Sequence, residues 1–313
     1  MQWRKLLMSG GAALGGVAAY NFLAERRAAQ LPELPGATTG RLDWRGHGIA
    51  YTWQGAGPAV LLIHSIGPWS WSWEWRHNVE ALATRYTVYT LDLLGFGRSD
   101  RPAVHYTPRL YLALIRDVVR RVVGGPTALV GAGLSAAYAT ELAAADPAQF
   151  PLLVLVTPPG LTQLRQRPTA TSGAGRQLVS APVLGTAAWN TRVTRSALER
   201  QLRAAYYRDA RVSEELVAVA AATTHQPGAK YAPAAWQANQ LNLDIRGALR
   251  RLHQPTLLVW GAQAEQHPAE ESFGYRALKR DLRVAILDAA GDFPHEEQPE
   301  AFDEVVGEFL ERA

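Results

Sequence analysis

The stretch TALVGAGLSAAYATELAA, residues 127–144, indicates the fold class, because it joins a strand-like run to a helical run through a glycine turn. Residues 127–132 are small or apolar throughout, as expected of a strand that is covered on both faces of a sheet. Gly131 and Gly133 mark a tight turn, and the residues after it are predicted to form a helix. A buried strand followed directly by a helix is the repeating unit of α/β proteins.

The same unit recurs on both sides of this stretch. Strand-like runs occur at residues 49–54, 59–65, 86–92, 152–160, 255–261 and 283–291. Helical spacing occurs at residues 74–85 and 299–313, and at 108–123, where Thr107 and Pro108 form a typical helix start. Repeated strand–helix units predict a mostly parallel, doubly wound sheet of about eight strands with helices on both faces.

The strand pattern stops after residue 160 and resumes near residue 255. The intervening segment, residues 161–250, has the character of helices and loops. A helical segment inserted after the sixth strand predicts a lid over the carboxyl edge of the sheet, where such folds bind ligands. The predicted α/β core is therefore residues 41–160 and 251–313, and a Pro/Gly/Thr-rich linker precedes it at residues 28–40.

Composition and charge argue against several classes of function. The 313 residues carry a formal net charge of +4, and their basic residues are scattered, so we expect no nucleic-acid binding. The chain has no cysteine, which excludes disulfides, thiolate catalysis and cysteine-ligated metal. Its eight histidines are dispersed without metal-binding spacing, so we expect no metal and no other cofactor.

The N-terminal segment, residues 1–27, differs from the rest of the chain. Arg4 and Lys5 precede an uncharged run at residues 6–24, which is just long enough to cross a bilayer as a helix. Gly11 and Gly15 form a G-x-x-x-G spacing that permits close helix contact in lipid. We expect a membrane anchor. The alternatives are a cleaved signal peptide of an exported protein, or a soluble or surface-lying segment of a cytoplasmic one.

Three separate segments resemble the α/β-hydrolase fold superfamily. The first is GPAVLLIHSIGPWSWSWEWRHNVEALATRYTVYTLDLLGFGRSDRP, residues 57–102, which contains the motif D-L-x-G-x-G-x-S from Asp92 to Ser99. The second is LLVWG, residues 257–261, which is similar to the strand before the family's catalytic acid. The third is AGDFPHEEQPEAF, residues 290–302, which is similar to the segment that carries the family's histidine. The resemblance covers about residues 41–312 and implies a Ser–His–acid site.

The three catalytic positions of that family do not carry its residues in this chain. The nucleophile turn G-x-S-x-G has Gly133 in place of the serine, Ala264 stands where the acid is expected, and Asp292 stands where the histidine is expected. A serine needs a base to take its proton, and the base needs an acid to orient it. The resemblance therefore predicts a pseudoenzyme in which conventional ester hydrolysis is absent, and no catalytic residue is assigned.

Glycine at the nucleophile turn also has a structural interpretation. The residue at this turn is normally held in a strained backbone conformation that costs about 1–3 kcal/mol. Glycine adopts such a conformation with little penalty. Ser135, two positions further along, could be regarded as a displaced nucleophile, but it lies in the first helical turn and should point away from the tip of the turn. We therefore expect Ser135 to be a packing residue.

The resemblance places a group of side chains around a ligand pocket. The candidates are His64, Ser65, Trp69, Trp71, Gly133, Leu134, Thr157, Asp292 and His295, and the predicted lid adds His225, Tyr231 and Trp236. Trp69 and Trp71 belong to PWSWSWEW, residues 68–75, which either packs into the lid and core or forms an aromatic wall for an apolar ligand. The carboxyl group of Asp292, in an apolar cleft, is expected to accept a hydrogen bond or to anchor a polar ligand group. His295 resembles a second histidine of the family that is usually structural.

Three hypotheses of function remain. In the first, the chain binds a small apolar ligand or a protein partner that the sequence does not identify. In the second, it is a hydrolase or lyase of small apolar substrates with relocated catalytic residues, such as Asp292, His64 or Ser65, and these groups should have perturbed pKa values. In the third, it is an interaction protein whose pocket has filled in, which predicts bulky side chains beside Gly133 and no ligand-sized cavity.

Overall fold

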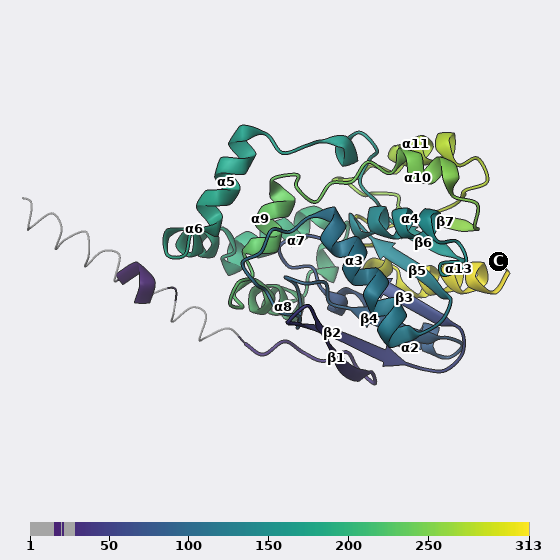
Figure 1. Cartoon of the computed structure of the whole chain (residues 1–313), viewed down its shortest axis with the longest axis horizontal. Coiled ribbons are helices and arrows are strands. Elements are labelled where there is room, and N and C mark those ends of the chain that lie inside the picture. Colours follow the sequence, from purple (N-terminus) through teal and green to yellow (C-terminus); the bar gives the residue numbers. More distant parts are fainter. Residues whose placement is uncertain (1–15, 20, 22–28, 313) are drawn as a thin grey trace, which may run out of the picture.

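The structure is a computed structural model that describes residues 16–19, 21 and 29–312. The predicted membrane anchor, residues 6–24, lies largely outside these residues. Within the described ranges, no helix is both long enough and apolar enough to span a bilayer. Figure 1 shows the described chain as a sheet with helices packed around it.

An eight-stranded sheet forms the centre, with the strand order β1-β2-β4-β3-β5-β6-β7-β8. The strands are β1 (Thr38–Trp44), β2 (His47–Gln54), β3 (Ala59–Ile63), β4 (Thr87–Leu91), β5 (Thr127–Ala132), β6 (Leu153–Val156), β7 (Thr256–Gly261) and β8 (Arg283–Leu287). The pairings from β4 to β8 are parallel, whereas β2 pairs antiparallel with both β1 and β4. The predicted mostly parallel, doubly wound sheet is confirmed.

The hairpin of β1 and β2 corrects the predicted end of the linker. β1 begins at Thr38, inside the segment that the Pro/Gly/Thr composition assigned to the linker. Arg45 and Gly46 join the two strands with φ values of 56° and 78°. A two-residue turn with both φ values positive matches the twist of an antiparallel pair, and glycine reaches this conformation at little cost.

Helices cover both faces of the sheet. One face is covered by α3 (Pro108–Val118), α4 (Ser135–Ala145), α10 (Arg246–Arg251) and α11 (Ser272–Leu278), and the other by α2 (Val79–Ala83) and α13 (Pro299–Arg312). Side chains of β3 alternate between the two cores, because Leu61 and Ile63 pack into one and Val60 and Leu62 into the other. A strand buried on both faces is apolar at every position, which is why its sequence pattern was readable.

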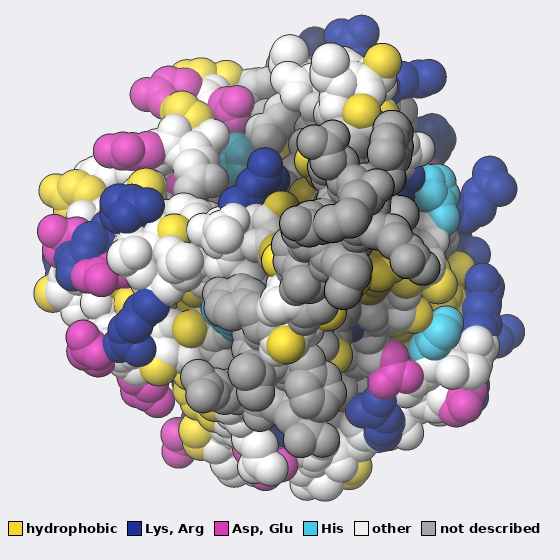
Figure 2. Space-filling view, turned by 90° about the vertical axis from the view of Figure 1, so that its left-hand side faces the viewer, with side chains coloured by type: hydrophobic (Ala, Val, Ile, Leu, Met, Phe, Trp, Pro, Cys, Tyr) yellow, Lys and Arg dark blue, Asp and Glu magenta, His cyan; other side chains and the backbone are white. Residues whose placement is uncertain are grey.

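A helical insertion occupies the chain between β6 and β7. Its main helices are α5 (Ala170–Ser180), α6 (Leu184–Arg192), α7 (Arg195–Ala205), α8 (Glu214–Thr224) and α9 (Tyr231–Gln237). The insertion has its own apolar core, which includes Leu198, Leu202 and Leu216. Figure 1 shows these helices gathered at the end of the molecule away from the C-terminus, and Figure 2 views the molecule from that end, where acidic and basic side chains both occur around the edge. The Asn21 side chain donates a hydrogen bond to the Val183 carbonyl of the insertion over 2.8 Å.

Candidate functional site

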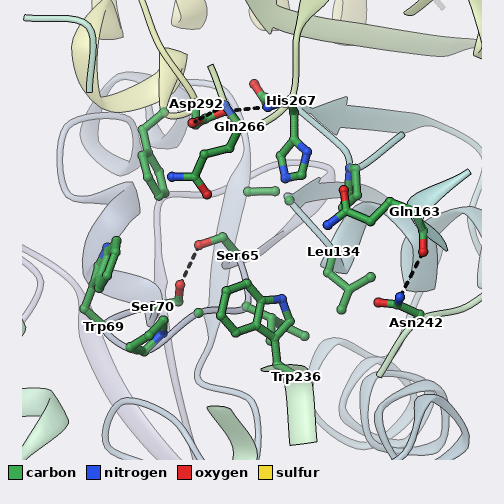
Figure 3. Close-up of a pocket in the computed structure, with 18 residues that line it drawn as sticks. Ser65, Trp69, Ser70, Leu134, Gln163, Trp236, Asn242, Gln266, His267 and Asp292 are labelled. Atoms are coloured by element: carbon green, nitrogen blue, oxygen red, sulfur yellow. Dashed lines mark hydrogen bonds between the residues drawn. The ribbon is translucent and has the colours of Figure 1, made fainter. Parts of the chain in front are cut away.

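A cavity of about 350 Å³ lies between the carboxyl ends of β3, β5 and β6 and the helical insertion. It is lined by Ser65, Ile66, Gly67, Pro68, Trp69, Ser70, Ala132, Gly133, Leu134, Thr157, Pro159, Gln163, Trp236, Asn242, Gln266, His267, Asp292 and Phe293. Figure 3 shows Asp292, Gln266 and His267 on one side of the cavity and Trp236 on the opposite side. The carboxyl edge of a parallel sheet gathers these loops, because the strands end there together.

Gly133 forms the tip of the turn between β5 and α4. Its φ value is +53°, in the left-handed region that glycine adopts with little penalty. Its N–H donates to the Val156 carbonyl over 2.9 Å, which ties the turn to β6. A Cβ atom built on Gly133 would stand 3.2 Å from the Ser65 Cβ. The turn therefore keeps the strained geometry of a nucleophile elbow while the position itself carries no side chain.

Ser65 follows β3 and is bound on two sides by one buried carboxyl group. The Ser65 N–H donates to Glu74 Oε1 over 2.7 Å, and the Ser65 hydroxyl donates to Glu74 Oε2 over 2.8 Å. Ser70 Oγ lies 2.8 Å from Ser65 Oγ (Figure 3). Burial raises the pKa of the Glu74 carboxyl well above its usual value, and the nearby Glu296 raises it further. Glu74 comes from the short 3₁₀ helix at Ser72–Trp75.

Asp292 lies in the loop after β8 and faces the cavity. Its carboxyl oxygens accept the backbone N–H groups of His267 over 3.2 Å and of Gln266 over 3.4 Å, both drawn in Figure 3. Burial raises the pKa of Asp292 to about 7, and these two hydrogen bonds lower it only in part. Asp292 can therefore donate or accept a hydrogen bond near neutral pH, which suits recognition of a polar ligand group.

His267 is a cavity residue that the sequence interpretation missed. It lies three residues beyond Ala264 in the loop after β7, whereas Ala264 itself is buried in the core and does not line the cavity. Its Nδ1 is buried and has no hydrogen-bond partner within the described chain. The distance from this Nδ1 to Glu271 Oε2 is 4.0 Å. Burial lowers the pKa of His267 to about 4, so the imidazole is neutral at pH 7.

Thr157 adds a buried hydroxyl group at the end of β6. Its φ value is +38°, which is strained for a β-branched residue. Its Oγ1 is buried and has no hydrogen-bond partner among the residues that the structure describes. A strained residue with an unsatisfied hydroxyl on a cavity wall is well placed to bind a polar group of a ligand.

Three of the predicted pocket residues are placed elsewhere by the structure. His64 is fully buried, because its Nδ1 donates to the Ser65 carbonyl and its Nε2 accepts the Leu93 N–H over 3.0 Å. Trp71 stacks on Trp73, with ring centroids 5.9 Å apart, in a separate apolar cluster. These contacts correct the expectation that His64 and Trp71 line the cavity.

His295 is also turned away from the cavity. Its ring lies 4.3 Å from the Trp75 ring and 5.8 Å from the Phe302 ring, and the residue is fully buried. The candidate nucleophile Ser135 donates its hydroxyl to the His64 carbonyl over 2.6 Å and is likewise buried. From the predicted lid, Trp236 lines the cavity, whereas His225 and Tyr231 do not.

A family model described as "Alpha/beta hydrolase family" matches residues 60–305. The chain belongs to the alpha/beta hydrolase family. Among the curated proteins that the chain resembles are two hydrolases with named substrates. The 2-(acetamidomethylene)succinate hydrolase of Mesorhizobium japonicum is 26% identical over 82% of this chain and 90% of its own length. The 2-hydroxy-6-oxo-6-(2'-aminophenyl)hexa-2,4-dienoic acid hydrolase of Metapseudomonas resinovorans is 24% identical over 84% of this chain and 87% of its own length.

Solved structures of hydrolases share this arrangement of strands and helices. A serine hydrolase involved in carbazole degradation superposes with a TM-score of 0.72 and 21% identity, covering 88% of this chain and 100% of that chain. A mutant of the meta-cleavage product hydrolase CumD superposes with a TM-score of 0.72 and 22% identity, covering 88% of this chain and 98% of that chain. At these identities the likeness concerns the alpha/beta hydrolase fold alone.

Proposed function

We propose that this alpha/beta hydrolase family member binds a small, neutral, mainly apolar molecule in the cavity and does not use the family's Ser–His–acid mechanism. The observation that carries the proposal is an open cavity of about 350 Å³ at a nucleophile turn whose tip is Gly133. This volume lies within the range of about 300–1,000 Å³ that is usual for small-molecule sites. It is not what the filled-pocket hypothesis predicts.

The lining of the cavity favours a neutral ligand with one polar group. Ile66, Leu134 and Trp236 supply apolar surface, and Thr157, His267 and Asp292 supply polar atoms. No lysine or arginine occurs among the described lining residues. The names of the two relatives describe carboxylic acids as substrates. Here a ligand carboxylate would lie near Asp292 without a cation, at a cost of several kcal/mol.

Removing Trp236 tests the cavity as a binding site. Trp236→Ala is expected to weaken binding of acetophenone, a small neutral aromatic ketone, about tenfold, because apolar contact worth roughly 1.5 kcal/mol is lost. Isothermal titration calorimetry measures this affinity, and benzoate serves as the charged probe of similar shape. Trp53→Ala, which removes a half-buried tryptophan from β2, is the matched control and should leave the affinity for acetophenone unchanged. Unchanged affinity in Trp236→Ala, or tighter binding of benzoate than of acetophenone, would contradict the proposal.

Restoring a serine at the nucleophile turn should not restore hydrolysis. Gly133→Ser is expected to leave the hydrolysis rate of p-nitrophenyl acetate at the wild-type level, because Asp292 occupies the position of the base. It should also lower the free energy of unfolding by about 1–2 kcal/mol, since a Cβ at φ +53° is strained and crowds Ser65. A rate increase of about 100-fold or more would show that His267 can act as the base for a serine here.

A further inference from the structure

We propose that Ser65 is a nucleophile displaced from the elbow and that Glu74 is its general base, so that an ester bound in the cavity acylates Ser65. This inference rests on the proposed function, because the ester must first bind in the cavity. It adds a reaction that the family's catalytic positions, Gly133, Ala264 and Asp292, cannot carry out in this chain.

The position of Ser65 is the first observation that supports the proposal. A Cβ atom on Gly133 would stand 3.2 Å from the Ser65 Cβ and 3.6 Å from its Cα. The Ser65 side chain therefore lies immediately beside the place that an elbow serine would occupy. Figure 3 shows it on the wall of the cavity, between the group of Gln266 and Asp292 and the ring of Trp236. The carbonyl group of a ligand that contacts the nucleophile turn at Gly133 would therefore also contact Ser65.

The contacts of Glu74 are the second observation. Its two carboxyl oxygens hold the N–H and the hydroxyl of Ser65 at 2.7 and 2.8 Å, which aims the Ser65 proton at Oε2. His295 Nε2 lies 3.7 Å from Oε1, and burial keeps this imidazole neutral by lowering its pKa to about 3. The charges nearest this carboxyl group are the ion pair of Arg76 and Glu296. Only the deprotonated form of Glu74 can accept the Ser65 proton, and because burial raises the pKa of this carboxyl group, that form is a stronger base than an exposed carboxylate.

Two backbone N–H groups can donate hydrogen bonds to the carbonyl oxygen, on which negative charge develops when Ser65 attacks the ester. Ile66 follows Ser65, and Leu134 follows Gly133. Both residues line the cavity, and neither backbone N–H has a hydrogen-bond acceptor among the described residues. In alpha/beta hydrolases, an oxyanion is bound by the N–H after the nucleophile and by one from the loop after the third strand. With residue 65 as the nucleophile, Ile66 supplies the N–H that follows the nucleophile and Leu134 supplies the second N–H.

The proposed reaction has two steps, acylation of Ser65 and hydrolysis of the acyl–Ser65 ester. The Ser65 Oγ forms a bond to the carbonyl carbon of the ester, its proton moves to Glu74 Oε2, and the carbonyl electron pair moves onto oxygen. When the tetrahedral intermediate collapses, the bond to the alcohol oxygen breaks, and the alcohol leaves with the proton from Glu74. Water then attacks the acyl–Ser65 ester and gives one proton to Glu74, which returns it to Ser65 as the carboxylic acid is released.

A fluorophosphonate probe tests the proposal directly. The phosphorus–fluorine bond breaks, a phosphorus–oxygen bond to serine forms, and the proton moves to Glu74. We expect one adduct by intact-mass spectrometry, mapped to Ser65 by peptide sequencing, and its complete loss in Ser65→Ala. The matched control is Ser135→Ala, which removes another buried serine hydroxyl with no carboxylate partner and should label at the wild-type rate. Glu74→Gln should slow labelling about 100-fold or more.

The outcomes separate this inference from the proposed function. Absence of an adduct in the wild-type protein, or an adduct that persists in Ser65→Ala, overturns the role of Ser65. If acetophenone binds and no adduct forms, the inference fails alone. If the adduct maps to Ser65 and acetophenone does not bind, the proposed ligand class fails instead. Thermal unfolding of each variant checks its fold, and if Glu74→Gln does not fold, the Ser65→Ala and Ser135→Ala pair still decides the identity of the nucleophile.

Discussion

Replacing Glu297 with alanine is expected to lower the free energy of unfolding by about 3–5 kcal/mol. Glu297 is fully buried at the end of the short helix α12 (Pro294–Glu297). Its carboxyl oxygens accept three backbone N–H groups: Gly291 over 2.6 Å, Tyr207 over 2.9 Å and Arg208 over 3.1 Å. Alanine would leave these three donors without an acceptor, and an unsatisfied buried donor costs about 1–3 kcal/mol.

The same contacts join the cavity loop to the helical insertion. Tyr207 and Arg208 follow α7, and Gly291 precedes Asp292. Urea unfolding measures the loss of stability, and acetophenone titration should show weaker binding in Glu297→Ala, because the loop that carries Asp292 loses its support. Glu297→Gln keeps one acceptor oxygen and should lose less stability. Glu300→Ala, at an exposed position of α13, is the matched control and should be neutral. A loss below about 1 kcal/mol in Glu297→Ala would show that water replaces the carboxylate.

Replacing Asp292 with asparagine is expected to remove a pH dependence of stability between about pH 4 and pH 7. The folded-state pKa of Asp292 is about 7, above its unfolded value near 3.8. Between these two values the folded state binds more protons than the unfolded state, so the free energy of unfolding decreases as pH rises through this window. This difference in pKa corresponds to a change of at most about 4 kcal/mol in the free energy of unfolding across the window. Because Asp292 is partly exposed, we expect a change of about 2 kcal/mol.

Thermal and urea unfolding at pH 5 and pH 8 check this prediction. Asp292→Asn should be more stable than the wild-type protein at pH 8, and its free energy of unfolding should change less with pH. Acetophenone should bind the wild-type protein about fivefold more tightly at pH 5 than at pH 8, because protonated Asp292 can donate a hydrogen bond to the ketone. This difference should vanish in Asp292→Asn.

Asp303 provides a matched control for that experiment. Burial raises its pKa to about 7 as well, but it binds Asn78 and does not line the cavity. Asp303→Asn should therefore flatten the stability profile without altering the pH dependence of ligand binding. Equal effects of both variants on binding would show that the pH dependence reflects the stability of the fold and not a contact between Asp292 and the ligand.

Much of the fold could be predicted because the central strands are buried on both faces. Residues 59–63 and 127–132 are apolar or small at nearly every position, and this pattern depends on no distant residue. The edge strand Thr38–Trp44 was missed, since it is mostly exposed and its composition resembles that of a linker. At the site, Ser65, Gly133 and Thr157 could be proposed because each follows a strand whose carboxyl end meets the others at one edge of the sheet.

The local sequence is enough to show which chemical groups the chain carries at each position and where its strands end. It shows no hydroxyl group at residue 133, no imidazole at residue 292 and no carboxyl group at residue 264. The contacts between these side chains come from the tertiary fold. His64 and His295 lie in the core, His267 lines the cavity, and the carboxyl group of Glu74 binds Ser65 beside Gly133. Side-chain direction depends on packing between segments far apart in the chain, which local sequence patterns do not encode.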